Sequence, residues 1–233
     1  MTIGVIGCEG FVGASLCRYI STTDNDLVKI HRNNFDDSQE IKFDVLINAA
    51  TPSKKYWALN NPLDDFQATV GLTAEVVYNW QYDKLIQIST ISAQCQLDHP
   101  YGINKYLAEQ LVLTHNDNNL IIRLGNLFGE GLKKGIVYDI INNNTLFVSG
   151  NSRYTFIDVD KAAKIIYEKL GSKGIEGVSS RNSISLKEIV SELHLNREFG
   201  DRVEILPEPE NSDSPDVAAV VTYIKKNLSN INT

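Results

Sequence analysis

The chain has 233 residues, of which 42% are hydrophobic and 22% charged, as in an ordinary globular protein of one large domain or a domain with a smaller lobe. Its formal net charge of −7 argues against nucleic acid as a partner, because a phosphate backbone is bound by basic surfaces. No apolar run approaches the roughly 20 residues of a membrane span, and no signal peptide is visible, so we expect a cytoplasmic protein without a membrane partner.

The cysteines are Cys8, Cys17 and Cys95, an odd number without C-x-x-C spacing. This pattern predicts free thiols in a reducing compartment, and neither a disulfide framework nor a metal site. Cys8 has two interpretations, a redox-sensitive thiol or simply a small residue that fits its turn.

The first predicted element is a short apolar strand that ends in a glycine-rich turn. Gly7, Gly10 and Gly13 follow the strand at three-residue steps, and a helical pattern begins among them. Such a turn exposes backbone N–H groups at a helix N-terminus, whose partial positive charge suits a pyrophosphate. Gly7 allows the tight turn, Gly10 lets the backbone approach the phosphate, and Gly13 lets the helix pack closely. The predicted dinucleotide contacts are Gly7, Gly10, Phe11, Val12 and Gly13.

The second predicted strand, residues 27–31, is followed by Arg32 and not by an acid. In dinucleotide-binding folds an acid at this place binds the ribose of NAD, whereas an arginine suits the 2′-phosphate of NADP. Arg32 therefore favours NADP(H), with NAD(H) as the alternative, unless it is simply a solvated loop residue. Asp36 or Asp37 is a candidate contact for the adenine. Residues 33–43 hardly hold a helix and a strand, so one βα unit is predicted to be compressed or missing.

Apolar strands and amphipathic helices alternate as far as residue 124. The predicted strands are 44–50, 85–92 and 120–124, and the helices run from 61 or 64 to 80 and from 101 to 113. This alternation predicts an α/β protein with a Rossmann-type, doubly wound parallel sheet. Strand 44–50 ends in the small residues Ala49 and Ala50, as is needed where a cofactor crosses the carboxyl end of a strand.

After residue 125 glycines interrupt the pattern. We expect helices at 136–141, 160–170, 186–193 and about 217–226, strands at 146–148 and 153–159, and a loop at 207–215. Residues 1–125 are predicted to form a dinucleotide-binding domain whose sheet is completed by part of 145–170. Residues 126–233 are predicted to form a small, reduced α/β substrate-binding lobe.

Thr90, Tyr101 and Lys105 form the predicted catalytic group. Tyr101 and Lys105 lie four residues apart on one helix and project from the same face, and Thr90 ends the preceding strand. Tyrosine is a poor base near neutral pH, and a neighbouring ammonium favours its phenolate. Tyr101 would exchange a proton with a substrate oxygen that Thr90 holds, unless the tyrosine and lysine are ordinary surface residues.

Several short segments together resemble a known family. They are Gly7-Cys8-Glu9-Gly10-Phe11-Val12-Gly13, Asn48-Ala49-Ala50, Ile88-Ser89-Thr90, Tyr101-Gly102-Ile103-Asn104-Lys105, Arg123-Leu124-Gly125-Asn126-Leu127-Phe128-Gly129, Phe156-Ile157-Asp158-Val159-Asp160 and Leu186-Lys187-Glu188-Ile189. In this order they resemble an extended short-chain dehydrogenase/reductase, of the NAD-dependent epimerase/dehydratase family that modifies nucleotide sugars. The resemblance implies Tyr101 as acid/base, Lys105 on the nicotinamide ribose and Thr90 as its hydroxyl partner. It also implies Ser89 beside the cofactor and Asn126 in the substrate pocket.

The chain departs from this family's pattern at several positions. Thr69 stands where the central helix usually has an asparagine, and Tyr154 stands where an arginine usually meets a nucleotide phosphate. Arg153, one position away, is interpreted either as a phosphate ligand or as a member of a structural ion pair. Arg123 ends a buried strand and is predicted to be structural.

We therefore expect an NAD(P)-dependent oxidoreductase or epimerase that acts on a nucleotide-activated sugar, foremost a keto-sugar reductase. A dehydratase fits less well, because Ile91 and Ser92 follow Thr90 where such relatives usually have an Asp-Glu pair. The alternatives are a catalytically silent dinucleotide-binding regulator and a reductase of a non-nucleotide carbonyl compound. Relatives often dimerise through the helix that carries the tyrosine, so a homodimer is possible.

Overall fold

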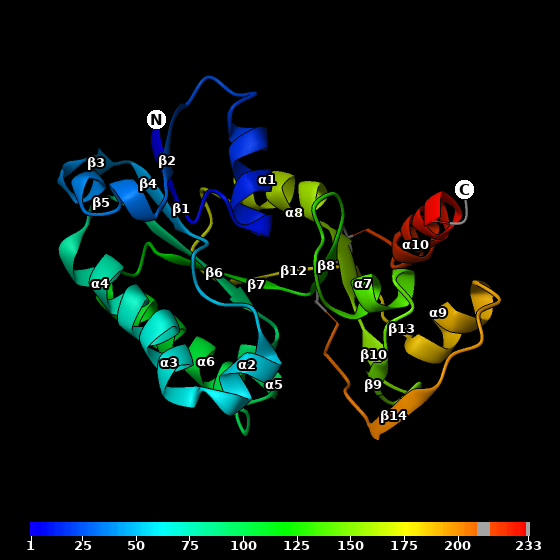
Figure 1. Ribbon diagram of the computed structural model, residues 1–233. Coiled ribbons are helices and arrows are strands. Elements are labelled where there is room, and N and C mark those ends of the chain that lie inside the picture. The colour runs from blue at the N-terminus through cyan, green and yellow to red at the C-terminus, as the bar shows by residue number, and fades with distance from the viewer. Residues whose placement is uncertain (209–214, 232–233) are drawn as a thin grey trace. The chain divides into compact units, whose positions relative to one another are not determined.

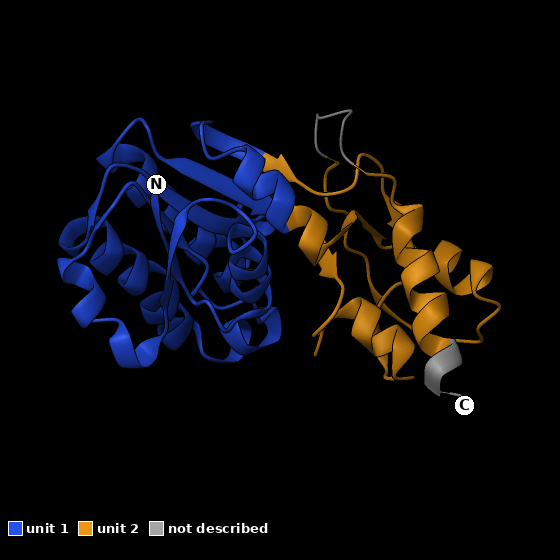
Figure 2. Cartoon of the chain, turned by 90° about the horizontal axis from the view of Figure 1, so that it is seen from above, with its two compact units in different colours: residues 1–124, 163–176 blue, residues 125–162, 177–233 orange. Residues whose placement is uncertain are grey.

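The computed structural model describes residues 1–208 and 215–231 and divides into two compact units (Figure 2). Unit 1 contains residues 1–124 and 163–176, and unit 2 contains residues 125–162 and the chain from 177 onward. The first break thus lies within one residue of the boundary expected after residue 125. The predicted loop at 207–215 falls largely on residues 209–214, which lie outside the described residues.

A six-stranded sheet forms the centre of unit 1 (Figure 1). The strands are β1 (Thr2–Ile6), β2 (Asp26–Ile30), β4 (Val45–Asn48), β6 (Leu85–Thr90), β7 (Leu120–Leu124) and β12 (Gly174–Val178). Their order is β12-β7-β6-β4-β1-β2, and the pairs β1–β2, β1–β4, β4–β6 and β6–β7 are all parallel. The predicted Rossmann-type sheet is confirmed, because the chain runs outward from β1 in both directions.

The sixth strand does not come from residues 145–170, as the sequence had suggested. Those residues supply β9 (Leu146–Val148), which pairs with β14 (Phe199–Arg202), and most of the helix α8 (Val159–Glu168). The sheet instead uses β12, anchored where the Gly174 N–H donates to the Asn119 carbonyl at 2.9 Å. The sequence of β12, Gly-Ile-Glu-Gly-Val, has no apolar run to mark it as a strand.

The sheet ends at β2 because the chain builds no further strand beside it. Residues 32–40 form two 3₁₀ turns, η1 (Arg32–Asn34) and η2 (Asp37–Glu40), and the chain then enters β3 (Lys42–Phe43), which pairs with β5 (Gln81–Tyr82). The predicted loss of one βα unit is therefore confirmed.

The helices of unit 1 are mostly where periodicity placed them. They are α1 (Phe11–Ile20), α2 (Lys55–Asn60), α3 (Pro62–Phe66), α4 (Leu72–Asn79), α5 (Ser92–Cys95), α6 (Pro100–His115) and α8. The predicted helix of residues 61–80 is α3 and α4 joined by a π-helical turn, η3 (Gln67–Gly71). Helices α2 and α5 were not expected, since each is too short to show an apolar period.

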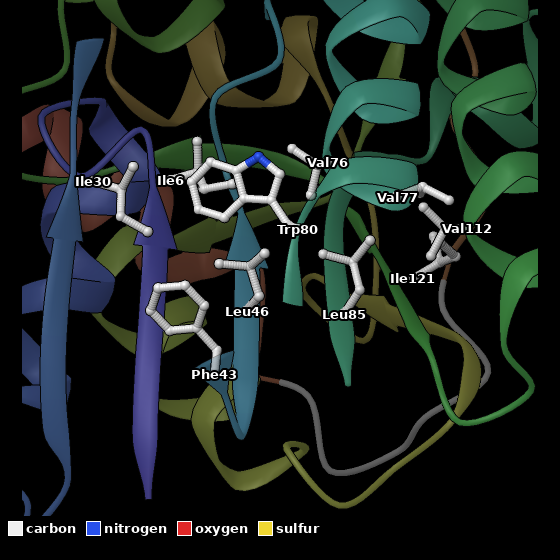
Figure 3. Packing of buried hydrophobic residues seen from close by; sticks show 10 residues of the cluster. All are labelled: Ile6, Ile30, Phe43, Leu46, Val76, Val77, Trp80, Leu85, Val112 and Ile121. Atoms are coloured by element: carbon white, nitrogen blue, oxygen red, sulfur yellow. The ribbon is translucent and has the colours of Figure 1, made fainter. Parts of the chain in front are cut away.

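A buried cluster fixes α4 and α6 against one face of this sheet (Figure 3). Its members are Ile6, Ile30, Phe43, Leu46, Val76, Val77, Trp80, Leu85, Val112 and Ile121. Figure 3 shows the Trp80 indole among the side chains of the strands, and its ring lies 6.2 Å from that of Phe43. Side chains alternate along a strand, so Ile3 and Val5 of β1 face the opposite side, where α1 packs.

Unit 2 consists of short elements. They are β8 (Asn126–Phe128), α7 (Ile136–Ile141), β9, β10 (Arg153–Tyr154), β11 (Phe156–Asp158), β13 (Ile184–Ser185), α9 (Leu186–Glu192), β14 and α10 (Ala218–Ile231). Helix α9 begins with a capping box, in which Ser185 and Glu188 satisfy each other's backbone N–H groups. Among the described residues of either unit, no helix is both long and apolar enough to cross a bilayer.

The core cluster generates a test of the fold. Leu46 is fully buried, so we expect Leu46→Ala to lower the free energy of unfolding by about 2–5 kcal/mol. Leu63→Ala is the matched control, because Leu63 is 69% exposed and its truncation should change stability by less than about 0.5 kcal/mol. Urea unfolding followed by the fluorescence of Trp57 and Trp80 measures both. Equal losses of unfolding free energy in Leu46→Ala and Leu63→Ala would contradict the placement of Leu46 in the core.

Candidate functional site

The glycine turn after β1 has the geometry that its spacing predicts. Gly7 has a φ of +80°, and a Cβ there would lie 2.8 Å from the Ala50 Cα. A Cβ on Gly13 would lie 2.1 Å from the Gly7 carbonyl oxygen, so α1 packs against the turn only through glycine. Gly10 is the N-cap of α1 and offers no side-chain cap, and the first turn contains no acid. The N-terminal N–H groups of α1, which begins with Phe11 and Val12, can therefore face an anion.

The end of β2 lies beside this turn. The Gly7 N–H donates to the Ile30 carbonyl at 3.0 Å, which ties the turn to the last residue of β2. Arg32 follows two residues later at the start of η1, where it is exposed and forms no hydrogen bond or ion pair with any residue that the structure describes. Asp36 is exposed after η1. Both residues thus lie near the turn in sequence and topology, and their contacts to a cofactor remain predictions.

A line of contacts leads from the glycine turn along the carboxyl edge of the sheet. Ala49, after β4, donates its N–H to the Ile6 carbonyl at 3.0 Å, and Ala50 packs against Gly7. The next residue, Thr51, accepts a hydrogen bond of 2.5 Å from the Lys105 ammonium through its hydroxyl. Lys105 is buried on α6 although it carries a charge. The cation is therefore held at the edge where β4 ends.

Tyr101 and Thr90 continue this line. The Lys105 nitrogen lies 5.6 Å from the centre of the Tyr101 ring, one helical turn away on α6. The phenol is buried, with 7% of the residue exposed, and is hydrogen-bonded to the Thr90 hydroxyl at the end of β6. The structure thus brings the three predicted catalytic residues together.

The phenol is held in its protonated form. Burial raises the pKa of Tyr101 to about 12, because a phenolate loses hydration there; the hydrogen bond from Thr90 lowers that pKa, and the nearby Asp65 carboxylate raises it. Tyr101 is therefore protonated near neutral pH. The expected effect of the Lys105 ammonium on the phenolate stays a prediction; its nitrogen lies 5.6 Å from the centre of the Tyr101 ring.

A buried ion pair joins α6, the helix that carries Tyr101 and Lys105, to the neighbouring strand β7. Arg123 on β7 donates from its Nη2 to Glu109 on α6 at 2.6 Å, and the Glu109 side chain is fully buried. Ser89, the neighbour of Thr90 on β6, donates its hydroxyl to the same carboxylate at 2.5 Å. The structural role predicted for Arg123 is confirmed. The Ser89 hydroxyl is engaged with Glu109, so a cofactor contact of Ser89 could use only its backbone.

The two predicted substrate residues belong to unit 2. Asn126 on β8 donates from its side-chain amide to the Thr155 carbonyl at 3.4 Å. Arg153 on β10 pairs with Glu188 at 3.1 Å and donates to the Ser183 hydroxyl and carbonyl at 3.1 and 3.0 Å. These contacts match the structural alternative for Arg153, and its role as a phosphate ligand stays a prediction.

Comparison with a protein-family model gives a match over residues 3–174, to a family described as the NAD dependent epimerase/dehydratase family. The match covers more than half of the chain. The chain belongs to this family. No curated protein sequence matches it.

Solved structures of nucleotide-sugar enzymes share the fold of this epimerase/dehydratase family member. The dTDP-4-dehydrorhamnose reductase of Bacillus anthracis, in complex with NADP, is 18% identical with a TM-score of 0.78, over 100% of this chain and 98% of that one. MoeE5 in complex with UDP-glucose and NAD is 12% identical, with a TM-score of 0.81 over all of both chains. The UDP-glucuronic acid 4-epimerase of Bacillus cereus is 17% identical, with a TM-score of 0.71 over 98% and 97% of the chains.

Sequence reasoning missed some residues of the site in this family member. Thr51 holds Lys105, and the signal for it was present, because a hydroxyl follows strand β4 just as Thr90 ends β6. Asp65 on α3 accepts a hydrogen bond of 2.8 Å from Asn104 on α6 and is fully buried. Nothing in the sequence separates Asp65 from its exposed neighbour Asp64.

The buried ion pair generates a second test. Arg123→Met leaves Glu109 buried without its cation, so we expect the free energy of unfolding to fall by about 3–5 kcal/mol. The double variant Glu109→Met with Arg123→Met should recover much of this loss, since no charge is then buried. Lys42→Met is the control, because its pair with Asp83 is exposed and contributes about 0–1 kcal/mol. A loss as small as that of Lys42→Met would show that Arg123 does not stabilise Glu109.

Proposed function

We propose that the protein is an NAD(P)(H)-dependent oxidoreductase that reduces the keto group of a nucleotide-activated sugar, with Tyr101 as the proton donor. The observation that carries the proposal is the line of contacts along the sheet edge, from Gly7 through Ala50, Thr51 and Lys105 to Tyr101. It joins an anion-binding turn to a buried acid. The solved structures with this fold, in complexes with NADP, NAD and nucleotide sugars, support the substrate class.

The residues at the turn fit a dinucleotide. Three glycines keep side chains away from the N-terminus of α1, and no acid lies in its first turn to repel a phosphate. Arg32, after β2, is a cation without a described partner where a 2′-phosphate would lie, which favours NADP(H) over NAD(H). We infer that Gly7, Gly10, Gly13 and Arg32 hold the cofactor, together with the backbone after β4.

The protein's own groups then perform the acid step. When bound, the cofactor would supply the hydride that the carbonyl carbon receives. The Tyr101 phenol donates its proton to the oxygen that gains charge, and the Thr90 hydroxyl holds that oxygen in place. Lys105, fixed by Thr51, lies where its charge can stabilise the phenolate that remains. A buried phenol with a raised pKa suits reduction, because the group must start the reaction protonated.

Catalytic residues distinguish this proposal from a silent dinucleotide-binding regulator. A binding module needs neither a buried phenol nor a lysine beside it, and both are retained here. A carbonyl substrate without a nucleotide would use the same phenol, so only substrate specificity separates that alternative. NADPH oxidation with UDP- and dTDP-linked 4-keto sugars, compared with simple ketones, tests the substrate class. Turnover of the simple ketones alone would contradict the nucleotide-sugar proposal.

Tyr101→Phe tests the acid. The substitution removes the hydroxyl and keeps the ring, so NADPH binding should persist while turnover falls by at least about 100-fold. Steady-state NADPH oxidation and the thermal shift with NADPH measure the two properties. Tyr106→Phe, one residue beyond Lys105 and only half-buried, is the control and should keep full turnover. Undiminished turnover of Tyr101→Phe would remove this mechanism.

Arg32 generates the prediction on cofactor choice. NADPH should raise the melting temperature more than NADH at equal concentration, since stabilisation grows with RT ln(1 + [L]/Kd). Arg32→Ala should reduce the NADPH shift and leave the NADH shift nearly unchanged, because only NADPH carries the 2′-phosphate. Arg18→Ala, on the exposed side of α1, is the matched control. An equal or larger shift with NADH in the unsubstituted protein would overturn the assignment of Arg32.

A further inference from the structure

Asp65 is a buried carboxylate beside the candidate active site that pairs with no cation among the described residues. The residue is 0% exposed, and its Oδ2 accepts one hydrogen bond of 2.8 Å, from the Asn104 amide. Its Oδ1 is buried and has no hydrogen-bond partner among the described residues. Glu109, the other fully buried acid on this side of the sheet, has the Arg123 guanidinium and the Ser89 hydroxyl instead.

Such an arrangement lowers the stability of the folded protein, so a functional role would explain why the carboxylate is there. An unpaired buried charge costs free energy that a single hydrogen bond from a neutral amide does not offset. Buried acids with incomplete partners concentrate at functional sites, where they set the charge state of a neighbour. An apolar residue at position 65 would fill the same space at lower cost, so the carboxylate itself is the feature to explain.

The partner of Asp65 lies within the catalytic segment of α6. Asn104 comes three residues after Tyr101 and directly before Lys105, so it neighbours Tyr101 on the helix surface. The hydrogen bond therefore joins α3 to the part of α6 that carries the acid. The Asp65 charge also acts on the phenol directly, since it raises the pKa of Tyr101.

We propose that Asp65 is a positioning residue that holds the catalytic segment of α6 through Asn104 and, by its buried charge, keeps Tyr101 in the phenol form required of a proton donor. This inference rests on the proposed role of Tyr101. It assigns to α3 an influence on the protonation of Tyr101: beside the larger effect of burial, the negative charge favours the protonated form, from which a proton is donated in reduction. Lys105 opposes it from the same helix as Tyr101, with its ammonium drawn toward Thr51.

The other groups near the phenol do not provide this control. Thr90 from β6 hydrogen-bonds to the phenol and favours its ionised form. At the start of α6, the His99 Nδ1 accepts from the Tyr101 N–H at 3.1 Å, so this ring nitrogen is directed at the backbone. Glu109, two turns along α6 from Tyr101, is neutralised by Arg123 of β7. Cys95 of the adjacent α5 directs its thiol to the Ile91 carbonyl.

The test measures the ionisation of Tyr101 in the protein without substrate or cofactor. Phenolate absorbance is recorded from pH 8 to about 12, with circular dichroism at each pH to verify the fold, and the same titration of a Tyr101→Phe partner is subtracted. Asp65→Asn keeps an acceptor for Asn104 and removes the charge, so Tyr101 should ionise about one pH unit lower. Asp65→Leu, which removes the charge with an apolar side chain, should shift it in the same direction.

Asp64→Asn is the matched control, because it makes the same change on the exposed side of α3 and should leave the titration unchanged. A shift in both Asp65 variants and none in Asp64→Asn supports the proposal. Coincident titrations of the Asp65 variants and the unsubstituted protein overturn it, as does loss of the native fold in both variants, which would make the role of Asp65 purely structural. Because no substrate is present, these outcomes are independent of whether Tyr101→Phe abolishes turnover.

Discussion

The close approach of two backbones at the carboxyl edge of the sheet is the constraint on which the rest of the site depends. Gly7 leaves β1 with a positive φ and packs against Ala50 after β4, at a distance that admits no side chain on Gly7. This approach fixes where the chain turns into α1 and where it continues to Thr51. Thr51 in turn holds the Lys105 ammonium beside Tyr101. One steric requirement thus places the glycine turn and Tyr101 on the same edge.

The features that follow from local sequence rules could be predicted. Regular alternation of strands and helices predicted the parallel sheet, and the short polar stretch before β3 predicted that one βα unit is absent. The glycine spacing predicted the tight turn and the Tyr101–Lys105 spacing predicted that these two side chains are neighbours, because close backbone approach and one helical turn require those spacings. These are constraints within a few residues of each other, which a sequence displays directly.

Features that depend on distant partners could not be predicted. β12 is short, carries two glycines and joins the sheet through a hydrogen bond to Asn119, so its own residues do not mark it as a strand. Ser89 resembled a cofactor contact, but its hydroxyl is directed to Glu109, twenty residues later on another element. The charge state of Tyr101 depends on distant partners in the same way: spacing reveals Lys105 on the same helix, whereas burial and Asp65 come from the packing of other elements.

Two buried acids of unit 1, one on α3 and one on α6, have different electrostatic effects. Glu109 is paired and hydrogen-bonded, so its charge is compensated and its effect is to lock α6 onto β6 and β7. Asp65 pairs with no cation among the residues that the structure describes, and its charge raises the pKa of Tyr101. A lysine close to the phenol favours base chemistry, and a buried carboxylate close to it favours acid chemistry. Burial and the Asp65 charge outweigh the hydrogen bond from Thr90, so the phenol is protonated near neutral pH, the form that the proposed reduction of a carbonyl group requires.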